Sequence, residues 1–398
     1  MNSKIPAIEG GLPVRPKEKF LVFGSPCIEE DEIAEVVSSL RTGWLGTGPK
    51  VKKFEESFRQ YKGSHYAVAL NSCTAALHLS LLATGVGPGD EVITTAMTFC
   101  ATINAIIHSG AKPVLVDCDP KTMNIDPALI ESKINHKTKA FLIVHFAGRP
   151  CAMDKILPIV KKHKLILIED CAHAIESEYH GKKTGTFGHL GCFSFYVTKN
   201  ITTGEGGMAI TQNSAYAAKI KTLALHGMSK DAWKRFGDEG YKHYKVIECG
   251  FKYNMMDIQA AIGLHQFARL EKYWQIRQKI WNTYNVAFAN LPIERPSNPE
   301  PDTKHAHHLY TIRINKENTG MTRDYFLNAM TKENIGVGVH YLSIPEHPYY
   351  QKTFGWKVRN FPQAHRLGQE TVSLPISAKL NDDDVNDVIK AVYKIFGK

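Results

Sequence analysis

Short apolar runs alternate with amphipathic segments along the first half of the chain. An apolar run of about four to eight residues between turn residues is typical of a strand buried on both faces of a sheet. We therefore expect strands at Tyr66–Leu70, Glu91–Thr95, Lys112–Val116, Phe141–His145, Leu165–Ile168 and Cys192–Val197. Helical spacing of apolar residues occurs before and between them, as at Glu29–Leu40. This succession predicts an α/β fold with a large, doubly wound, mostly parallel sheet.

The last third of the chain has a different pattern. A long amphipathic helix is expected at Gln266–Leu291, followed by a proline-rich loop at 292–304. Strand and helix patterns then alternate over 308–314, 322–332, 336–340 and 382–395. We expect a large domain over residues 1–265, which includes an N-terminal arm, and a bridging helix with a smaller α+β domain over 266–398.

Composition narrows the class of protein. The formal net charge is +10, but the lysines are dispersed along the chain, which argues against nucleic-acid binding and favours a basic surface suited to anionic substrates. No apolar run approaches the length of a membrane span, and the N-terminus lacks the apolar core of a secretory signal, so we expect a cytoplasmic protein without membrane insertion. The eight cysteines include no Cys-x-x-Cys pair, which favours reduced thiols over disulfides or zinc.

An acid and a lysine follow two neighbouring strands. Asp170 lies where the strand at 165–168 would emerge at the carboxyl edge of the sheet, the usual place for ligands in such folds. The next apolar run leads to Lys199 and to a glycine-rich turn at 204–207. Taken alone, each residue is more often a surface group. Together they supply what pyridoxal phosphate (PLP) requires: a lysine amine that forms a Schiff base and moves protons, and a carboxylate that keeps the ring nitrogen protonated.

Other residues could hold the rest of such a cofactor. The expected strand at 66–70 turns into a helix through Asn71, Ser72, Cys73 and Thr74, which suits a phosphate, although a plain helix cap is the commoner use of such residues. Ser194 is a further phosphate donor. Phe99 could stack on the flat ring, its alternative being a place in the core.

The segments EDCAHA, FSFYVTKNITTGEGG and GFKYNMMDIQAAIG resemble the DegT/DnrJ/StrS family of nucleotide-sugar aminotransferases. The resemblance runs from about Pro13 to the C-terminus. In detail it is strongest to the enzymes that aminate C4 of a UDP-4-keto sugar, such as the UDP-4-amino-4-deoxy-L-arabinose synthases. It implies the PLP-dependent transferase fold of type I, like that of aspartate aminotransferase.

The resemblance also assigns roles to single residues. It places His173 against the PLP ring or its phenolic oxygen, and Asn254 at the cofactor phosphate of the other subunit of a homodimer. It implies that Tyr196, His308, His340 and Tyr341 line the substrate cleft, and that residues 231–244 form a sugar-nucleotide loop. Cys73 and His307 depart from the family pattern, which usually has Gly or Ala at the first position and, in a close relative, Trp at the second.

The expected function follows from the resemblance. An amino acid, with L-glutamate the first choice, would donate its amine to PLP, and the amine would then pass to C4 of a UDP-linked keto sugar for amino-sugar or glycan biosynthesis. Three alternatives stay open: a 3-aminotransferase acting on a dTDP- or GDP-keto sugar, a cyclitol transaminase, and a PLP-binding regulatory protein without turnover. The histidines of the C-terminal third match no metal-ligand spacing, so no metal site is expected.

Overall fold

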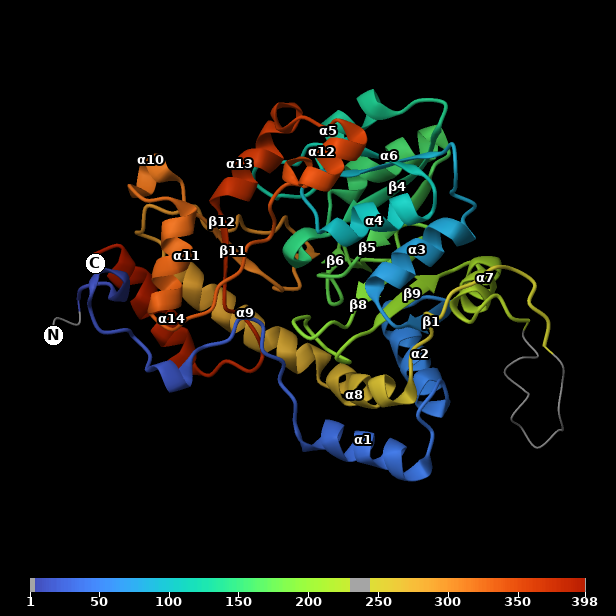
Figure 1. Cartoon of the computed structure of the whole chain (residues 1–398), viewed down its shortest axis with the longest axis horizontal. Helices are drawn as coiled ribbons and strands as arrows, with labels where there is room; N and C mark the ends of the chain where they lie inside the picture. The colour runs from blue at the N-terminus through green and yellow to red at the C-terminus, as the bar shows by residue number, and fades with distance from the viewer. Residues whose placement is uncertain (1–3, 230–243, 398) are drawn as a thin grey trace.

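A seven-stranded sheet forms the centre of the molecule in a computed structural model that describes residues 4–229 and 244–397 (Figure 1). The strand order is β1-β9-β8-β5-β4-β2-β3. Its strands are β1 (Tyr66–Leu70), β2 (Glu91–Thr95), β3 (Lys112–Val116), β4 (Thr138–Val144), β5 (Ile166–Asp170), β8 (Leu190–Ser194) and β9 (Gly207–Thr211). β9 is antiparallel to both neighbours, and the other neighbouring pairs are parallel, which confirms a mostly parallel α/β sheet.

Two strand boundaries differ from the sequence-based expectation in a way that matters for the site. β5 continues to its last residue, Asp170, so Glu169 and Asp170 belong to the strand instead of following it. β8 ends at Ser194, three residues before the expected end at Val197. Both differences arise from pairing: Asp170 is in register with Cys192, and Ser194 with Gly207, after which the chain leaves the sheet.

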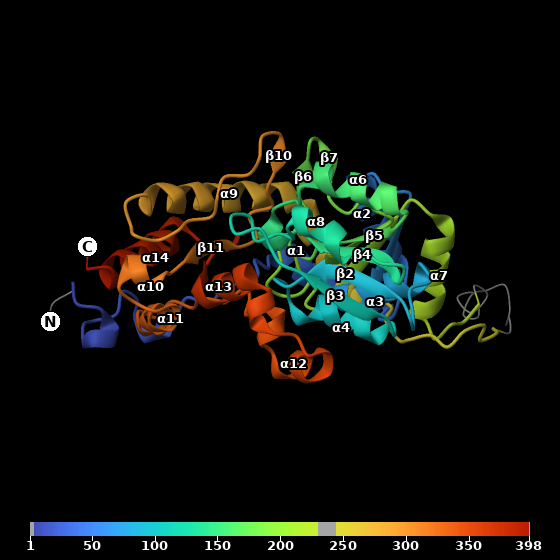
Figure 2. The same cartoon turned by 90° about the horizontal axis from the view of Figure 1, so that it is seen from above.

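Helices cover both faces of the sheet, as Figure 2 shows. The α-helices are α1 (Glu30–Thr42), α2 (Pro49–Lys62), α3 (Cys73–Ala83), α4 (Cys100–His108), α5 (Pro127–Ile130), α6 (Met153–His163), α7 (Ser214–Ala224), α8 (Asp257–Ala268), α9 (Leu270–Ala287), α10 (Lys316–Thr319), α11 (Arg323–Lys332), α12 (Pro348–Phe354), α13 (Pro362–Glu370) and α14 (Asp382–Ile395). Buried residues of α3, α4 and α7 form one core with the sheet, and those of α2, α6 and α8 pack on its other face. The doubly wound arrangement is therefore confirmed.

A second core lies beside the first. It is built on the two-stranded antiparallel pair of β11 (Tyr310–Arg313) and β12 (Thr371–Leu374), together with α9, α11 and α14. The expected strand at 336–340 is not a regular strand, because only Gly338 bridges to Ser373; β12 was not expected. A smaller three-stranded sheet of β6 (Glu178–Tyr179), β7 (Lys182–Lys183) and β10 (Thr303–Lys304) lies on the far side of the large sheet from α3. The domain limits at 265 and 266 stay a prediction.

The long helix expected at Gln266–Leu291 is two helices. α8 ends at Ala268 and α9 runs from Leu270 to Ala287, with Arg269 between them at φ −101° and ψ 8°. The Arg269 guanidinium binds Glu32 of α1, which anchors this junction. α9 then contacts both cores through Ile276 and leads from the large sheet to the smaller part (Figure 1).

Two further findings concern the chain as a whole. The sugar-nucleotide loop expected at 231–244 lies, except for Tyr244, outside the described residues. Among the residues that the structure describes, no helix has the length and apolar character needed to cross a membrane.

Candidate active site

A cavity of about 400 Å³ opens at the carboxyl ends of β5 and β8. It brings together most of the residues that the sequence singled out. The predicted residues that line it are Cys73, Thr74, Phe99, Asp170, His173, Ser194, Tyr196, Lys199, His340 and Tyr341. Their roles there stay predictions, but their convergence from five separate stretches of chain is a property of the fold.

Asp170 is the buried acid at the floor of this cavity. Its Oδ1 accepts a hydrogen bond from the Ala172 amide at 3.1 Å, and its Oδ2 accepts one from the Thr102 hydroxyl at 3.0 Å. Burial raises the pKa of the carboxyl, while these two hydrogen bonds and the charge of Lys199 oppose that rise. These two hydrogen bonds hold the carboxylate in one orientation, in which it can accept a hydrogen bond from a ligand bound in the cavity.

Lys199 lies in the loop that joins β8 to β9. The loop closes on itself, because the Lys199 amide donates to the Tyr196 carbonyl at 2.9 Å and the Phe195 amide donates to the Gly206 carbonyl at 2.9 Å. Burial lowers the pKa of the Lys199 amine to about 8. A substantial fraction of this lysine is therefore neutral near physiological pH, and a neutral amine is the form that attacks a carbonyl.

The N-terminus of α3 faces the cavity from the other side. Ser72 caps the helix, with its Oγ accepting from the Ala75 amide at 3.0 Å. The amides of Cys73 and Thr74, at the first two helical positions, have no partner within the helix. A Cβ on Gly207 would lie 2.3 Å from the Ser72 carbonyl carbon, so only glycine lets β9 approach this turn. Free amides and a hydroxyl at a helix N-terminus suit a phosphate.

Two histidines and a tyrosine form a connected wall beside Lys199. His173 Nδ1 accepts from the Ala147 amide at 3.2 Å, and its Nε2 lies 3.1 Å from the Tyr341 hydroxyl. The His308 ring lies against that of His173, with centroids 4.4 Å apart and the ring planes tilted by 34°. Burial lowers the pKa of both histidines well below the usual range, so both are neutral at pH 7. This wall therefore consists of neutral donors and acceptors beside the lysine.

Two predicted residues lie elsewhere. His308 does not line the main cavity; it lines a smaller neighbouring one of about 20 Å³ together with Lys199. Asn254 is outside both, and its Nδ2 donates to Thr47 Oγ1 at 2.7 Å, within the loop that joins α1 to α2. Its expected contact with a second subunit stays a prediction.

Thr102 was missed. Its signal in the sequence is weak, since a threonine three residues after Phe99 in the first turn of a helix is an ordinary residue. Thr98 was also missed, although its hydroxyl lies 2.8 Å from that of Thr102. Because Thr102 gives its proton to Asp170, it must accept from Thr98. The contact joins β5 to a helix that is 68 residues away in the chain, a pairing that only the fold reveals.

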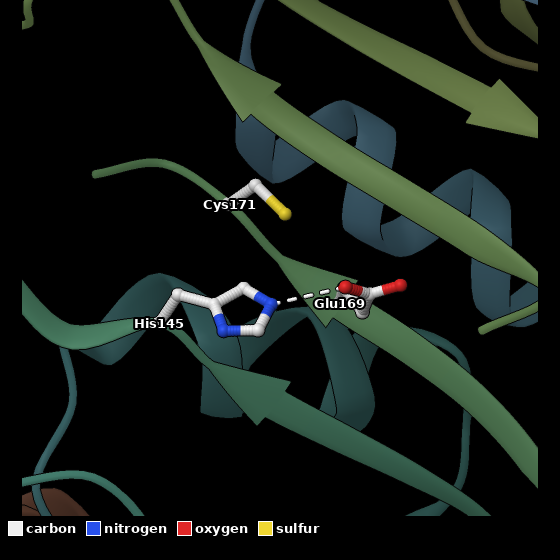
Figure 3. A group of neighbouring side chains, drawn as sticks. All are labelled: His145, Glu169 and Cys171. Carbon is white, nitrogen blue, oxygen red and sulfur yellow. Dashed lines mark hydrogen bonds and ion pairs between the residues drawn. The ribbon is translucent and has the colours of Figure 1, made fainter. Parts of the chain in front are cut away.

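A buried group near the site offers atoms that could bind a metal. His145, Glu169 and Cys171 place their side-chain ligand atoms within 4.8 Å of one another (Figure 3). Both carboxylate oxygens of Glu169 already have hydrogen-bond partners within the protein. They accept from His145 Nε2 at 3.0 Å and from the amides of Gly185 and Gly188 at 2.7 Å each. His145 Nδ1 accepts from the Cys151 amide at 3.0 Å. The polar side-chain atoms of His145 and Glu169 are thus all hydrogen-bonded within the protein, which accounts for the burial of these two residues.

The residues of the main cavity fit PLP. An aldehyde-reactive amine at Lys199, a buried carboxylate at Asp170 and phosphate donors at α3 are the groups that this cofactor needs. The aromatic ring of Phe99 lines the same space. The volume of about 400 Å³ lies within the range of small-molecule sites.

Comparisons with known proteins agree with this chemistry. The sequence profile of the DegT/DnrJ/EryC1/StrS aminotransferase family matches residues 26–393. The chain is 46% identical over 383 residues to the spore coat polysaccharide biosynthesis protein SpsC of Bacillus subtilis, covering 96% of this chain and 98% of that protein.

Solved structures are similar over the same span. Spr1654 of Streptococcus pneumoniae, known in PLP and pyridoxamine phosphate (PMP) forms, has a TM-score of 0.87 with both. The identity to its PMP form is 34%, covering 95% of this chain and 97% of the other. DesI, solved with its TDP-sugar product, has a TM-score of 0.87 and 28% identity, covering 100% of this chain and 97% of the other. The chain therefore belongs to the DegT/DnrJ/EryC1/StrS aminotransferase family, and pyridoxal phosphate is its cofactor.

Proposed function

We propose that this enzyme transfers an amino group from L-glutamate to C4 of a UDP-linked 4-keto sugar. The observation that carries the proposal is the convergence of Lys199, Asp170 and the α3 N-terminus on one cavity, in a chain similar to a protein solved with a TDP-sugar product. A basic chain with net charge +10 suits a doubly charged diphosphate. The similarity to SpsC supports a role in polysaccharide synthesis.

The residues divide the work as follows. PLP, when bound, acts as an electron sink for the carbon next to the transferred amine. Lys199 takes the proton from that carbon of the donor and returns one to the acceptor carbon, since its pKa of about 8 lets it do both near neutral pH. Asp170 would accept a hydrogen bond from the ring nitrogen of the bound cofactor and keep that nitrogen protonated. The amides of Cys73 and Thr74 and the Ser194 hydroxyl, which line the cavity, would hold its phosphate.

The substrate end of the cavity is formed by His340, Tyr341 and Tyr196. His340 Nδ1 lies 2.8 Å from the Ser373 hydroxyl, and burial lowers its pKa to about 3. It therefore offers a neutral imidazole to the sugar. Burial raises the pKa of the Tyr341 hydroxyl, which stays a proton donor for a sugar hydroxyl or keto oxygen.

We also propose that the working form is a homodimer with shared sites. Phe99 and Tyr196, which line the cavity, are 55% and 44% exposed in the single chain, and Trp44, in the loop that joins α1 to α2, is 56% exposed. Exposed large aromatic side chains of this kind suit an interface with a second subunit. Asn254 is placed beside the Trp44 loop by its bond to Thr47, and Asn254 of the partner subunit would reach the cofactor phosphate. Sedimentation of the PLP-loaded enzyme at micromolar concentration tests this; a monomer that is fully active would contradict it.

An optical experiment tests the reaction. The PLP form is converted with L-glutamate, the donor is removed, and keto-sugar nucleotides are added singly while the cofactor spectrum is recorded. Return of the original spectrum with a UDP-4-keto sugar supports the proposal. Return of the spectrum only with a dTDP- or GDP-3-keto sugar or a cyclitol ketone would show that the enzyme is an aminotransferase with a different acceptor from the one proposed. No change with any amino donor would support a PLP-binding regulatory protein.

A further inference from the structure

A buried ion pair lies outside the main cavity, and its arginine lines the smaller one. Glu176, in the segment after β5, and Arg277, in α9, have side chains that are 0% and 2% exposed, and their Oε1 and Nη2 atoms are 2.5 Å apart. Neither residue lines the main cavity. A buried ion pair adds little net stability compared with an apolar pair of the same size, so its presence here calls for another reason.

Asn200 connects this ion pair to His308. Its Nδ2 donates to Glu176 Oε2 at 2.7 Å and to the Ala306 carbonyl at 3.3 Å. Both partners can only accept, so they fix the orientation of the amide and leave its Oδ1 facing His308 Nδ1 at 2.7 Å. An amide oxygen can only accept. Nδ1 of His308 must therefore carry the ring proton.

The protonation of His308 follows from its surroundings. Burial lowers its pKa well below the usual range, and the charge of Lys199 lowers it further. The neutral ring has a single N–H, which is committed to Asn200, so Nε2 holds a lone pair. His308, Asn200, Arg277 and Lys199 line the same cavity of about 20 Å³.

We propose that Glu176 and Arg277 are positioning residues of the active site, which act through Asn200 to hold the proton on Nδ1 of His308 and leave Nε2 as a hydrogen-bond acceptor beside Lys199. An acceptor at that place orients the Lys199 amine when it carries the transferred proton. The inference deepens the proposed function, because it concerns how the same site handles that proton.

His173, whose ring lies against that of His308, has the opposite neutral tautomer, with its proton on Nε2. The Ala147 amide donates to His173 Nδ1, so the proton of His173 is on Nε2 and is donated to the Tyr341 oxygen. The Tyr341 proton is then free to point into the main cavity. The two neutral rings thus give the site one acceptor, at His308, and one donor, at Tyr341.

The tautomer can be measured directly. In PLP-loaded enzyme with ¹⁵N-labelled histidine at pH 7.5, long-range ¹H–¹⁵N correlation spectra distinguish the two neutral tautomers and the cation. His308→Gln identifies the His308 signals by their loss. We expect the Nδ1–H tautomer in the wild type. An Nε2–H or cationic His308 in the wild type would overturn the inference.

Two variants test the role of the network. Asn200→Leu removes the acceptor, and we expect His308 to shift to Nε2–H and the rate of the half-reaction with L-glutamate to fall about tenfold at an unchanged KM. The charge-swapped pair Glu176→Gln with Asn200→Asp keeps an acceptor at position 200, and we expect it to restore Nδ1–H and most of the rate. An unchanged tautomer or rate in Asn200→Leu would overturn the inference. If no amino donor reacts with the wild type, the proposed function fails while the tautomer result stands.

Discussion

The Thr102 hydroxyl donates a hydrogen bond to Oδ2 of Asp170 over 3.0 Å. It stabilises the ionised carboxylate against burial, which otherwise raises the pKa of Asp170. We predict that Thr102→Val lowers kcat about tenfold, because a less ionised Asp170 holds the ring proton less well. Thr331→Val is a matched control, since Thr331 is exposed and its hydroxyl donates to the Leu327 carbonyl of its own helix, α11. Asp170→Asn should lower kcat further than Thr102→Val; a wild-type kcat in Asp170→Asn would refute the assignment.

Lys199 is the residue on which turnover depends. We predict that Lys199→Ala lowers kcat more than about a thousandfold, because it removes the group that moves the proton. The fold should persist, since the hydrogen bond of Lys199 to another residue of the described chain, 4–229 and 244–397, is that of its backbone amide to Tyr196, which alanine keeps. Equilibrium dialysis should still detect PLP binding through the phosphate site. Normal amine transfer by this variant, measured by product formation, would exclude Lys199 as the catalytic lysine.

The lowered pKa of Lys199 predicts a pH dependence. Only the neutral amine attacks the PLP aldehyde, so the rate of PLP capture by the apoenzyme should rise with pH through a midpoint of about 8. Stopped-flow absorbance between pH 6 and 10 would measure it. The same shift affects folding: the unfolded lysine binds a proton that the folded one has lost between about pH 8 and 10.5, so this group makes the folded state more stable as pH rises through that window. If the midpoint of the PLP-capture rate lay near pH 10.5, the Lys199 amine would be exposed to solvent and its pKa would not be lowered.

Gly207 lets strand β9 pass close to the phosphate-binding turn. We predict that Gly207→Ala weakens PLP binding at least about tenfold, because its Cβ would lie 2.3 Å from the Ser72 carbonyl carbon and 2.5 Å from the Cys73 nitrogen and would displace the start of α3. Gly87→Ala is the control, since its added Cβ meets nothing closer than 3.8 Å. Titration of both apoproteins with PLP compares them. Equal affinities would show that the turn can move without loss of the phosphate site.

The buried pair of Glu176 and Arg277 predicts a stability difference. Arg277→Met leaves Glu176 buried without its counter-ion and should lower the free energy of unfolding by about 3–5 kcal/mol. Burial already raises the pKa of Glu176, so the loss should be smaller at pH 5, where the carboxyl can take up a proton, than at pH 8. The double variant Glu176→Met with Arg277→Met should recover most of the loss. Urea unfolding measures all three; an unstable double variant would show that the pair is needed for the fold itself.

The sequence predicted six of the seven strands of the large sheet, all except β9, and it predicted the meeting of an acid and a lysine at the edge of that sheet, because these features depend on local patterns. A largely apolar strand such as β1, with the sequence YAVAL, can be recognised from its residues alone. The order of strand, acid, strand and lysine then brings Asp170 and Lys199 to one edge of the sheet. The N-terminal turn of α3 likewise follows from its cap residue, Ser72.

What the sequence did not reveal depends on contacts between distant segments. Thr102 reaches Asp170 only because α4 packs beside β5, and Asn200 meets Glu176 and His308 only in the folded chain. The break at Arg269 follows from a bond to Glu32, which is 237 residues earlier. Hydrophobic periodicity continues through such a break, so a pattern alone cannot locate it.

Strand β9 determines when the cofactor site can first exist. Gly207 pairs with Leu70 on one side and with Ser194 on the other, so the turn after β1 and the end of β8 meet only through a strand made about 140 residues later. A chain emerging from the ribosome therefore carries an incomplete site until β9 has left the exit tunnel and inserted between β1 and β8, to both of which it is antiparallel. The cofactor must be acquired late in synthesis, and fragments that end before Gly207 should not retain it.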